Sequence, residues 1–426
     1  MADVVADDCC TFSYTSGTTG DPKGVKLTHK MLVQCAAAVN SRLAGTNSEL
    51  CEKDTYVSYL PAAHSFEQAL FGIVLAFGMR CGFYSGDPQK LLKEDLPALK
   101  PTFFPSVPRI FNRVYGVLQE KIKEASGCKA FILQKAISDK LAALRTTGTV
   151  EHCCYDKVIF SAFKAFLGGR VRLMITGSAP ISPDVLDFLK VCFACPIAEG
   201  YGMTETSAGS FTTMMGDTVS GHVGGPLANV KIRLRDIPEM GYYGSANPPK
   251  GEICLWGPSV MTGYFKNPQK TAEAFHDGWL LSGDVGVINA NGSVNIIDRA
   301  KNIFKLSFGE YIAPEKLENV YIQSGWLDQV WIYGDSLRDF ICIIAVVSPP
   351  KVKKWAASLD KPLEGVSEAL KTKALKDEIY ADLMALATAS KLNSLEKPKN
   401  MLLLEEPFSV ENDLLTPTMK LKRNVA

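Results

Sequence analysis

Ten residues near the start of the chain, 15–24 (TSGTTGDPKG), combine the groups that bind a polyphosphate. Their glycines leave backbone N–H groups accessible, the hydroxyl residues Thr15 to Thr19 can bind phosphate oxygens or a magnesium ion, and Lys23 adds a positive charge. The lysine follows a proline and precedes a glycine, so the segment is not a Walker loop. The alternative is a Gly- and Ser-rich surface linker, but a linker does not normally join a strand to a helix. We therefore predict a phosphate-binding loop.

A second segment, 199–206 (EGYGMTET), places an aromatic ring between two glycines and a carboxylate four residues later. A planar base can lie against Tyr201, and Glu205 can complete a Mg²⁺ site, since this ion takes a few carboxylates together with phosphate oxygens. Taken alone, the segment is as typical of a turn at the end of a strand. Together with the first loop, it predicts a nucleotide site.

Three further segments carry charged residues that could bind a ligand or mark a hinge. Asp284 ends the run 277–284 (DGWLLSGD) and could chelate the paired hydroxyls of a ribose, or it could make an Asx-turn. Residues 298–302 (DRAKN) concentrate charges at an apparent domain boundary, where a hinge can absorb backbone changes. Residues 415–423 (LTPTMKLKR) are basic, and by themselves would be a solvated tail.

The elements that must position these segments follow from the apolar pattern. An extended run over 9–14 leads into the loop, and a helix is expected from Thr28, giving strand, loop and helix. Residues 171–176 predict a buried strand, with Ser182 and Pro183 opening a helix, and 197–201 predict another strand. These predict an α/β fold with a parallel sheet over the first two hundred residues. Beyond Gly221 short strands predict a small barrel-like or antiparallel region, and a small α+β unit follows from Asp298.

The composition is that of an ordinary globular protein of two or three units, with 46% hydrophobic and 21% charged residues in 426. The formal charge of +1 gives no general field that would attract nucleic acid. Twelve cysteines are too few for a disulfide scaffold, and the pair Cys192 and Cys195 lies in an apolar run that predicts a packed core. No stretch reaches the ~20 apolar residues of a membrane helix, and no signal peptide is expected.

The motifs together resemble the adenylate-forming superfamily, and most closely the eukaryotic long-chain fatty-acid CoA ligases. The resemblance covers nearly the whole chain, and the run 303–315 (IFKLSFGEYIAPE) carries the specificity for fatty-acid ligases. Further matching runs are 61–67 (PAAHSFE), 85–87 (SGD), 169–180 (GRVRLMITGSAP) and 221–225 (GHVGG). The resemblance implies an α/β fold with a large AMP-binding domain over 1–298, which lacks its front part, and a small mobile C-terminal domain over 299–426.

The resemblance also implies the activation of a long-chain fatty acid by ATP and CoA through an acyl-adenylate, with Mg²⁺ as cofactor and no nucleic acid as partner. Thr18 and Glu205 would bind the metal, and Lys420 would reach the α-phosphate and carboxylate. His64 would lie near the carboxylate, Lys301 would be the hinge, and Gly309 would border the path of the thiol. The remaining nucleotide-binding positions would be Ser16, Gly17, Thr19, Gly20, Lys23, Tyr201, Gly202, Thr204, Asp284 and Arg299.

Two motifs depart from the usual fatty-acid ligase pattern without losing these residues. Residues 279–284 read WLLSGD instead of WLHTGD, and 298–301 read DRAK instead of DRKK. The chain is also shorter than such relatives at both ends. Alternatives are therefore an adenylate former with another acid or acceptor, and an inactive fragment that retains only nucleotide or partner binding. The expected location is the cytoplasm or the cytosolic face of the endoplasmic reticulum or another organelle, where an intact relative could also contact a membrane surface.

Overall fold

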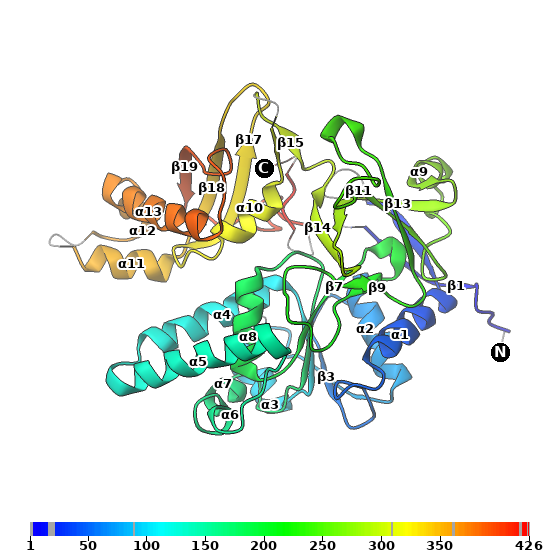
Figure 1. The fold of residues 1–426 in the computed structure, drawn as a ribbon, viewed down its shortest axis with the longest axis horizontal. Helices are drawn as coiled ribbons and strands as arrows, with labels where there is room; N and C mark the ends of the chain where they lie inside the picture. Colours follow the sequence, from blue (N-terminus) through cyan, green and yellow to red (C-terminus); the bar gives the residue numbers. More distant parts are fainter. Residues whose placement is uncertain are drawn as a thin grey trace.

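A computed structural model describes residues 3–15, 22–87, 90–307, 310–359, 363–416, 420–423 and 425. Its centre is a seven-stranded sheet in the order β4-β3-β5-β6-β7-β8-β9, shown in Figure 1 with helices on both faces. The first five strands in this order are parallel, as predicted, and β8 pairs antiparallel with both β7 and β9. Their bounds are β3 (Thr55–Ser58), β4 (Arg80–Phe83), β5 (Phe103–Ser106), β6 (Leu173–Thr176), β7 (Ile197–Tyr201), β8 (Phe211–Thr212) and β9 (Gly225–Pro226).

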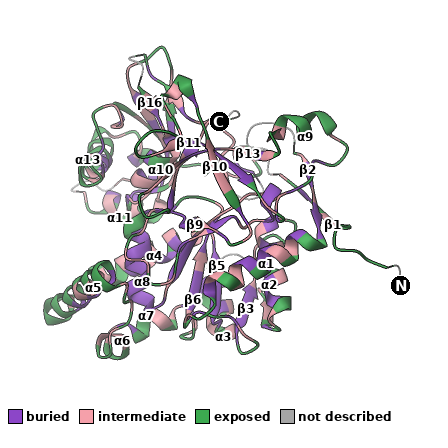
Figure 2. Ribbon diagram, turned by 45° about the vertical axis from the view of Figure 1, so that its right-hand side comes forward, coloured by how far each residue is buried: buried purple, intermediate pink, exposed green. Residues whose placement is uncertain are grey.

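Two helical layers bury the two faces of this sheet because side chains alternate along each strand. On one face Phe104, Met174 and Ile197 pack against helices that include α4 (Pro108–Lys123), α5 (Gly127–Thr147) and α8 (Pro183–Phe193). On the other face Tyr56, Phe103 and Leu173 pack against α1 (His29–Leu43) and α2 (Ser65–Ala76). Figure 2 shows the buried residues on β3, β5 and β6 between these layers. Short helical segments complete the layers: an element over Leu91–Asp95, α3 (Leu96–Leu99), α6 (Tyr155–Val158) and α7 (Ser161–Ala165).

The predicted helix start at Pro183 is confirmed, with Ser182 as its N-cap residue, although no side-chain cap hydrogen bond forms there. Cys192 and Cys195 are both buried free thiols in or beside α8, as the apolar run predicts. Burial raises the pKa of Cys195 to about 12. These two sulfurs therefore belong to the packed core.

The predicted order of strand, loop and helix is wrong in one respect. Residues Gly24–Thr28 form a strand, β2, which pairs antiparallel with β1 (Cys9–Tyr14), so the loop closes a hairpin before the helix begins. Val25 and Leu27 are fully buried and lie on the same face of β2, because side chains alternate along a strand. Thr28 then caps α1 by accepting a hydrogen bond from the Met31 backbone N–H at 3.2 Å.

A five-stranded antiparallel sheet lies beside the hairpin, in agreement with the antiparallel region predicted beyond Gly221. Its long central strand, β13, pairs with a strand on either side and carries Asp284. Its strands are β10 (Lys231–Arg235), β11 (Lys250–Trp256), β12 (Phe275–His276), β13 (Trp279–Ile288) and β14 (Val294–Arg299), and α9 (Pro268–Ala274) precedes β12.

The C-terminal part has a hydrophobic core of its own, which runs from Leu306 to Leu403. Three strands form its sheet, with β17 antiparallel to β18 and β19 parallel to β18. Its elements are β15 (Phe304–Lys305), β16 (Tyr311–Ile312), α10 (Pro314–Tyr321), β17 (Leu327–Gly334), β18 (Ile341–Val347), α11 (Pro349–Ala357), α12 (Val366–Ala369), α13 (Lys373–Ala389) and β19 (Asn400–Leu404). Figure 1 shows these helices on one side of the three strands.

Among the described residues, no helix combines the length and the hydrophobicity needed to cross a bilayer.

Candidate active site

A cleft of about 1520 Å³ opens where the carboxyl ends of β6 and β7 meet β13, β14 and the end of the chain. Ligands of open α/β sheets bind at this end of the strands. The cleft brings together predicted site residues that are far apart in the sequence, namely Lys23, His64, Tyr201, Gly202, Thr204, Glu205, Asp284, Arg299, Lys301 and Lys420. Ser16, Gly17, Thr18, Thr19, Gly20 and Gly309 lie outside the described residues.

The two ends of the predicted phosphate-binding loop are held together by the hairpin. The Thr15 backbone N–H donates to the Lys23 carbonyl at 2.9 Å, and the Lys23 N–H donates to Thr15 Oγ1 at 3.1 Å. Both residues line the cleft. The hairpin therefore fixes where the loop enters and leaves the site.

Asp284 lies inside β13 and is bound by two partners, so the alternative of an Asx-turn is wrong. It is buried, accepts a hydrogen bond from the Tyr201 hydroxyl at 2.5 Å, and lies 3.5 Å from Arg299 Nε on the neighbouring strand. Burial raises the pKa of Asp284 despite these two groups. Burial acts to lower the pKa of Arg299, but the carboxylates of Asp284 and Glu315 outweigh it and the pKa is raised. A carboxylate, a phenol and a guanidinium thus form one connected polar group in the cleft.

Glu205 lies in a single turn of 3-10 helix, Thr204–Thr206, directly after β7. Its side chain is buried and Oε1 accepts a hydrogen bond from the Tyr264 hydroxyl at 2.7 Å. Lys23 Nζ lies 4.7 Å from the centroid of the same tyrosine ring. Tyr264 therefore connects the lysine of the phosphate-binding loop to the carboxylate, a role that the sequence motifs did not reveal.

Gly202 is required by the close approach of two backbone segments in this turn. A Cβ atom at Gly202 would lie 2.0 Å from the Ala208 carbonyl oxygen, so no other residue fits without moving the backbone. This approach brings Tyr201 and Glu205 to the same cleft from either side of the turn.

His64 and Lys420 both line the cleft although they are far apart in the sequence. His64 caps α2, and its Nδ1 accepts a hydrogen bond from the Phe66 backbone N–H at 3.2 Å, which leaves the ring proton on Nε2. Burial, and then the charge of Lys420, lower the pKa of His64 to about 4, so the ring is neutral at pH 7. A neutral ring can lie beside a lysine without repelling it.

Lys420 lines the cleft, so the alternative of a solvated basic tail is wrong. Burial and the charge of Arg299 lower the pKa of Lys420, against the opposing carboxylates of Glu315, Asp284 and Glu205. Its backbone N–H donates to Thr416 Oγ1 at 3.0 Å, and Arg423 binds Glu318 of α10 through contacts of 2.8 and 2.5 Å. The ion pair anchors the segment that carries Lys420. Neither Glu318 nor Arg423 was predicted as a site residue, because an ion pair between distant positions leaves no local pattern.

The residues at the predicted hinge lie at the rim of the cleft. Lys301 is exposed in the turn that follows β14, and the neighbouring Asn302 donates to Glu315 Oε1 at 3.0 Å. Asp298 accepts hydrogen bonds from the Arg299 and Glu315 backbone N–H groups at 2.7 and 2.9 Å. These contacts join the end of β14 to the start of α10 without involving the Lys301 side chain.

Glu205 has the chemistry expected of a Mg²⁺ ligand, whereas a cage made only of protein groups is absent from the described part of the chain. No group of three or more His, Cys, Asp or Glu side chains gathers there around a common point. Mg²⁺ commonly uses one or two carboxylates and completes its octahedral shell with water and substrate phosphates. A single buried carboxylate beside a phosphate-binding loop fits this ion.

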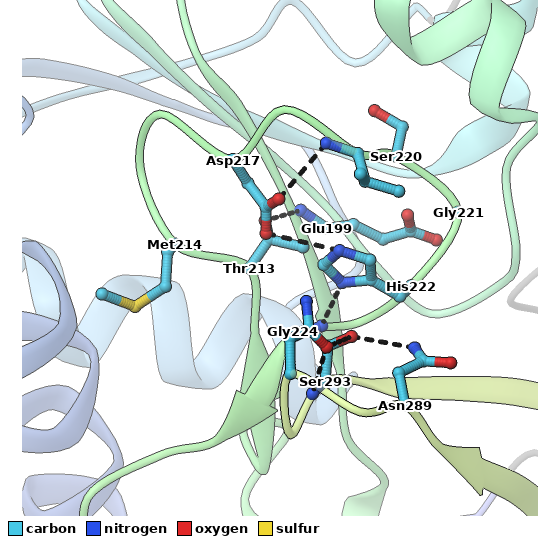
Figure 3. Close-up of polar contacts among 12 residues, drawn as sticks. Glu199, Thr213, Met214, Asp217, Ser220, Gly221, His222, Gly224, Asn289 and Ser293 are labelled. Atoms are coloured by element: carbon cyan, nitrogen blue, oxygen red, sulfur yellow. Dashed lines mark hydrogen bonds and ion pairs between the residues drawn. The ribbon is translucent and has the colours of Figure 1, made fainter. Parts of the chain in front are cut away.

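A second set of polar groups, drawn in Figure 3, includes Glu199 and His222, which also line the cleft. His222 Nδ1 accepts a hydrogen bond from the Gly224 backbone N–H at 3.0 Å, and its Nε2 lies 3.3 Å from Asp217 Oδ2. Glu199 is only 6% exposed, and its Oε2 has no hydrogen-bond partner among the described residues. Burial raises the pKa of Glu199 to about 8, although Lys190 and the Gly221 backbone act to lower it.

The raised pKa of Glu199 predicts a pH-dependent contribution to stability. Between its unfolded pKa of ~4.3 and about 8, the folded chain holds a proton that the unfolded chain releases, so stability falls as pH rises. Glu199→Gln removes this titration while Lys190, Asp187, Asp217 and His222 remain. We expect the melting temperature of wild type to fall relative to that of Glu199→Gln by a few degrees from pH 5 to pH 8. A difference that stays constant over this range would contradict the buried, proton-bearing carboxyl.

Comparison with known proteins shows the family to which the chain belongs. Residues 1–265 match the family model described as AMP-binding enzyme. The chain is 43% identical over 419 residues to long chain acyl-CoA synthetase 6, peroxisomal, of Arabidopsis thaliana, and 44% identical over 419 residues to long-chain-fatty-acid–CoA ligase 5 of Rattus norvegicus. These matches cover 98% of this chain but only 59% and 60% of the two relatives, so the chain spans about three fifths of their length.

A solved structure shows the same fold. The adenylation domain of a carboxylic acid reductase from Segniliparus rugosus, in complex with AMP and a co-purified carboxylic acid, aligns with a TM-score of 0.77 and 25% identity, over 99% of this chain and 59% of that one. The predicted resemblance in sequence and in fold class is thereby confirmed. The chain belongs to the family of AMP-binding enzymes.

Proposed function

We propose that this protein activates long-chain fatty acids by joining them to CoA at the expense of ATP, through an acyl-adenylate. The observation that carries the proposal is the position of Lys420, which lies in one cleft with the group formed by Tyr201, Asp284 and Arg299 and with Glu205. The two curated relatives are named as an acyl-CoA synthetase and a fatty-acid–CoA ligase, and the structural relative binds AMP and a carboxylic acid. These names support the choice of substrates.

In the first half of the reaction, a carboxylate oxygen of the fatty acid forms a bond to the α-phosphorus of ATP, and pyrophosphate leaves. Lys420 and Lys23 face the phosphate charge that develops, and such fixed positive groups stabilise the crowded transition state. Asp284 and Arg299 hold the ribose, while Tyr201, Gly202 and Thr204 form the wall against the base. Thr18 and Glu205 hold Mg²⁺, which neutralises phosphate charge when bound. The residues Ser16, Gly17, Thr19 and Gly20 supply N–H groups to the phosphates.

In the second half, the thiol of CoA releases its proton to solvent and its sulfur forms a bond to the acyl carbon, while the bond from that carbon to the phosphate oxygen breaks and AMP leaves with the bonding electrons. Neither half requires a covalent bond to the protein, so its residues position and stabilise. His64 would lie near the carboxylate of the fatty acid. Because its ring is neutral, it does not repel the positive charge of Lys420. Between the two half-reactions, residues 299–426 pivot near Lys301. This movement takes Lys420 away from the reacting groups and brings the Gly309 region to them. Support comes from the separate hydrophobic core of the C-terminal part and from the exposed position of Lys301.

The proposed partners are a long-chain fatty acid, ATP and CoA, with no nucleic acid. The cytosolic face of an organelle membrane is the proposed location, because an apolar acid partitions into membranes. One of the curated relatives is named as peroxisomal.

The function is tested by incubating the full-length protein that carries this sequence with ATP, Mg²⁺, CoA and palmitate. Palmitoyl-CoA and AMP should appear in equal amounts, as measured by mass spectrometry, and benzoate or acetate should replace palmitate poorly. Formation of ADP in place of AMP would contradict the proposal. A preference for the small acids would assign the cleft to another adenylate former.

Replacing Glu205 by glutamine is expected to raise the Mg²⁺ concentration needed for half-maximal activity by roughly tenfold, because one anionic ligand of the ion becomes neutral. The amide can still accept the hydrogen bond from Tyr264, so the loss of melting temperature should be small. Titration with MgCl₂ at saturating ATP measures the effect. An unchanged Mg²⁺ requirement together with a clear fall in melting temperature would show that Glu205 is a structural carboxylate. Tyr264→Phe is the matched control, because it removes the hydrogen bond and keeps the carboxylate.

A further inference from the structure

Two adjacent cysteines lie on the surface between α5 and α6. Cys153 and Cys154 are both exposed, and their sulfur atoms lie 3.5 Å apart in hydrogen-bond contact. Cys154 is the N-cap residue of α6 and has helical backbone angles. A helical turn places successive side chains about 100° apart, whereas a strand places them on opposite faces, so this turn lets the two sulfurs converge. Neither cysteine is among the described residues that line the active-site cleft, so the pair has no role in the proposed reaction.

A second pair of adjacent cysteines, Cys9 and Cys10, shows that adjacency alone does not bring two sulfurs together. Both residues belong to β1, whose successive side chains point to opposite faces. The Cys9 thiol donates to the Thr11 carbonyl oxygen at 3.3 Å, and the Cys10 thiol donates to the Leu27 carbonyl oxygen at 3.2 Å. These two sulfurs therefore contact different groups, in contrast to the pair beside α6.

The turn that carries the pair beside α6 is fixed by contacts on both sides. His152 Nδ1 accepts hydrogen bonds from the backbone N–H groups of Cys154 and Tyr155 at 3.4 and 3.2 Å, and the His152 and Tyr155 rings stack with centroids 4.1 Å apart. Asp156 Oδ2 accepts a hydrogen bond from the His152 backbone N–H at 2.8 Å. The other carboxylate oxygen of Asp156 pairs with Lys140 of α5, whose side chain is only 1% exposed. The turn is thus tied to the core, and ligands that are already in place lose little entropy on binding.

The separation of the two sulfurs matches the binding of one shared atom. Two sulfurs 3.5 Å apart that both bond to one atom at about 2.3 Å, the length of a zinc–sulfur bond, subtend an angle of about 100° at that atom. A direct disulfide is less favourable, because the Cα atoms of neighbouring residues are about 3.8 Å apart and disulfides usually need at least roughly 4.4 Å. The pair is therefore better suited to hold one soft atom than to bond to itself.

The number of available ligands favours a trivalent metalloid over a zinc ion. Zinc sites in proteins use three or four protein ligands. In the part of the chain that the structure describes, no group of three or more His, Cys, Asp or Glu side chains could hold a metal ion. A trivalent arsenic atom that carries one organic group needs only two more bonds, is pyramidal, and prefers sulfur as other soft centres do. Two converging thiols supply both of these bonds.

We propose that Cys153 and Cys154 form a modification site for trivalent arsenicals, which bind both sulfurs at once. With phenylarsine oxide, two arsenic–sulfur bonds form, the arsenic–oxygen bond breaks, and the oxygen leaves as water with the two thiol protons. Arsenic stays trivalent, so the step needs no oxidant or reductant. Two linked contacts should strengthen binding by about 10²- to 10⁴-fold over that of a single thiol.

The test treats the folded full-length protein with one equivalent of phenylarsine oxide in the presence of excess 2-mercaptoethanol, and then maps the adduct by trypsin digestion and mass spectrometry. Both cysteines lie in the tryptic peptide 146–157. This peptide should carry one arsenical, which the dithiol 2,3-dimercaptopropanol should remove. Cys153→Ser and Cys154→Ser should each raise the concentration needed for half-maximal labelling by about 100-fold or more. Their melting temperatures should match that of wild type, because both side chains are exposed.

The matched control is a chain that carries both Cys9→Ser and Cys10→Ser. It removes an adjacent pair whose sulfurs contact different groups, so labelling of peptide 146–157 should stay unchanged. In wild type, the peptide that ends at Lys23 and contains this other pair should be labelled far less than peptide 146–157. Equal labelling of the two peptides, loss of the adduct to 2-mercaptoethanol, or unchanged labelling in Cys153→Ser would each overturn the proposal.

Discussion

Replacing Lys420 by alanine is expected to lower palmitate-dependent exchange between ATP and pyrophosphate by about 10²- to 10³-fold, the usual cost of removing one fixed group that stabilises transition-state charge. Lys420 lies in the cleft near Arg299, with the Glu315, Asp284 and Glu205 carboxylates around it. Formation of thioester from supplied palmitoyl-AMP should change little, because the developing phosphate charge belongs to the first half of the reaction. Comparing the two half-reactions therefore tests the assigned role.

Lys422→Ala provides the control from the same segment. Lys422 pairs with Asp413 away from the cleft, so its removal takes away an equal charge at nearly the same position in the sequence. Exchange should remain within about twofold of wild type, as is usual for the loss of an exposed ion pair. If Lys420→Ala lowered the rates of both half-reactions equally, that result would contradict the proposed role of Lys420.

The second large effect is expected from Arg423→Ala, although Arg423 does not belong to the predicted catalytic set. Its guanidinium makes two contacts with Glu318, at 2.8 and 2.5 Å, and both side chains are mostly buried. Burial raises the pKa of Glu318 to about 7 even with Arg423 present. Removing the arginine leaves this carboxyl buried without its cation, which costs roughly 3–5 kcal/mol if the carboxyl stays charged. The segment carrying Lys420 would also lose its anchor to α10.

We therefore expect Arg423→Ala to lower both the melting temperature and the pyrophosphate exchange, and Glu318→Gln in the same chain to restore part of the stability but not the exchange. A double-mutant cycle on these two residues measures the interaction energy between Arg423 and Glu318, apart from the effect of each residue on its other neighbours. Lys399→Ala is the control, because its 3.4 Å pair with Asp339 is exposed on both sides and should contribute little. Normal exchange in Arg423→Ala would show that the anchor is not needed to place Lys420.

Much of the fold could be predicted because local signals agreed with it. The apolar run at 171–176 and the Ser182-Pro183 pair predicted β6 and the start of α8, and both are present. The hairpin of β1 and β2 was missed because the loop and the expected helix start at Thr28 are so close in the sequence. The five residues of strand between the loop and the helix were therefore not recognised. The parallel strand β19 has no simple local signal, since its partner β18 lies more than fifty residues earlier.

The candidate site likewise contains features that the sequence could predict and features that it could not. Asp284 and Arg299 lie in separate motifs, and the antiparallel register of β13 and β14 makes them neighbours, which no spacing in the sequence reveals. Tyr264 and Arg423 act through partners on other elements, so composition and periodicity gave no reason to select them. Lys420 was selected only through the resemblance, because a basic segment by itself indicates a solvated tail.

The most direct test of the central claim is to look for the acyl-adenylate itself. The full-length protein should be mixed with ATP, Mg²⁺ and palmitate without CoA, quenched in acid and analysed by mass spectrometry. We expect palmitoyl-AMP in an amount close to that of the protein, and its conversion to palmitoyl-CoA on addition of CoA. Absence of palmitoyl-AMP, while palmitoyl phosphate or ADP accumulates, would contradict adenylation in this cleft.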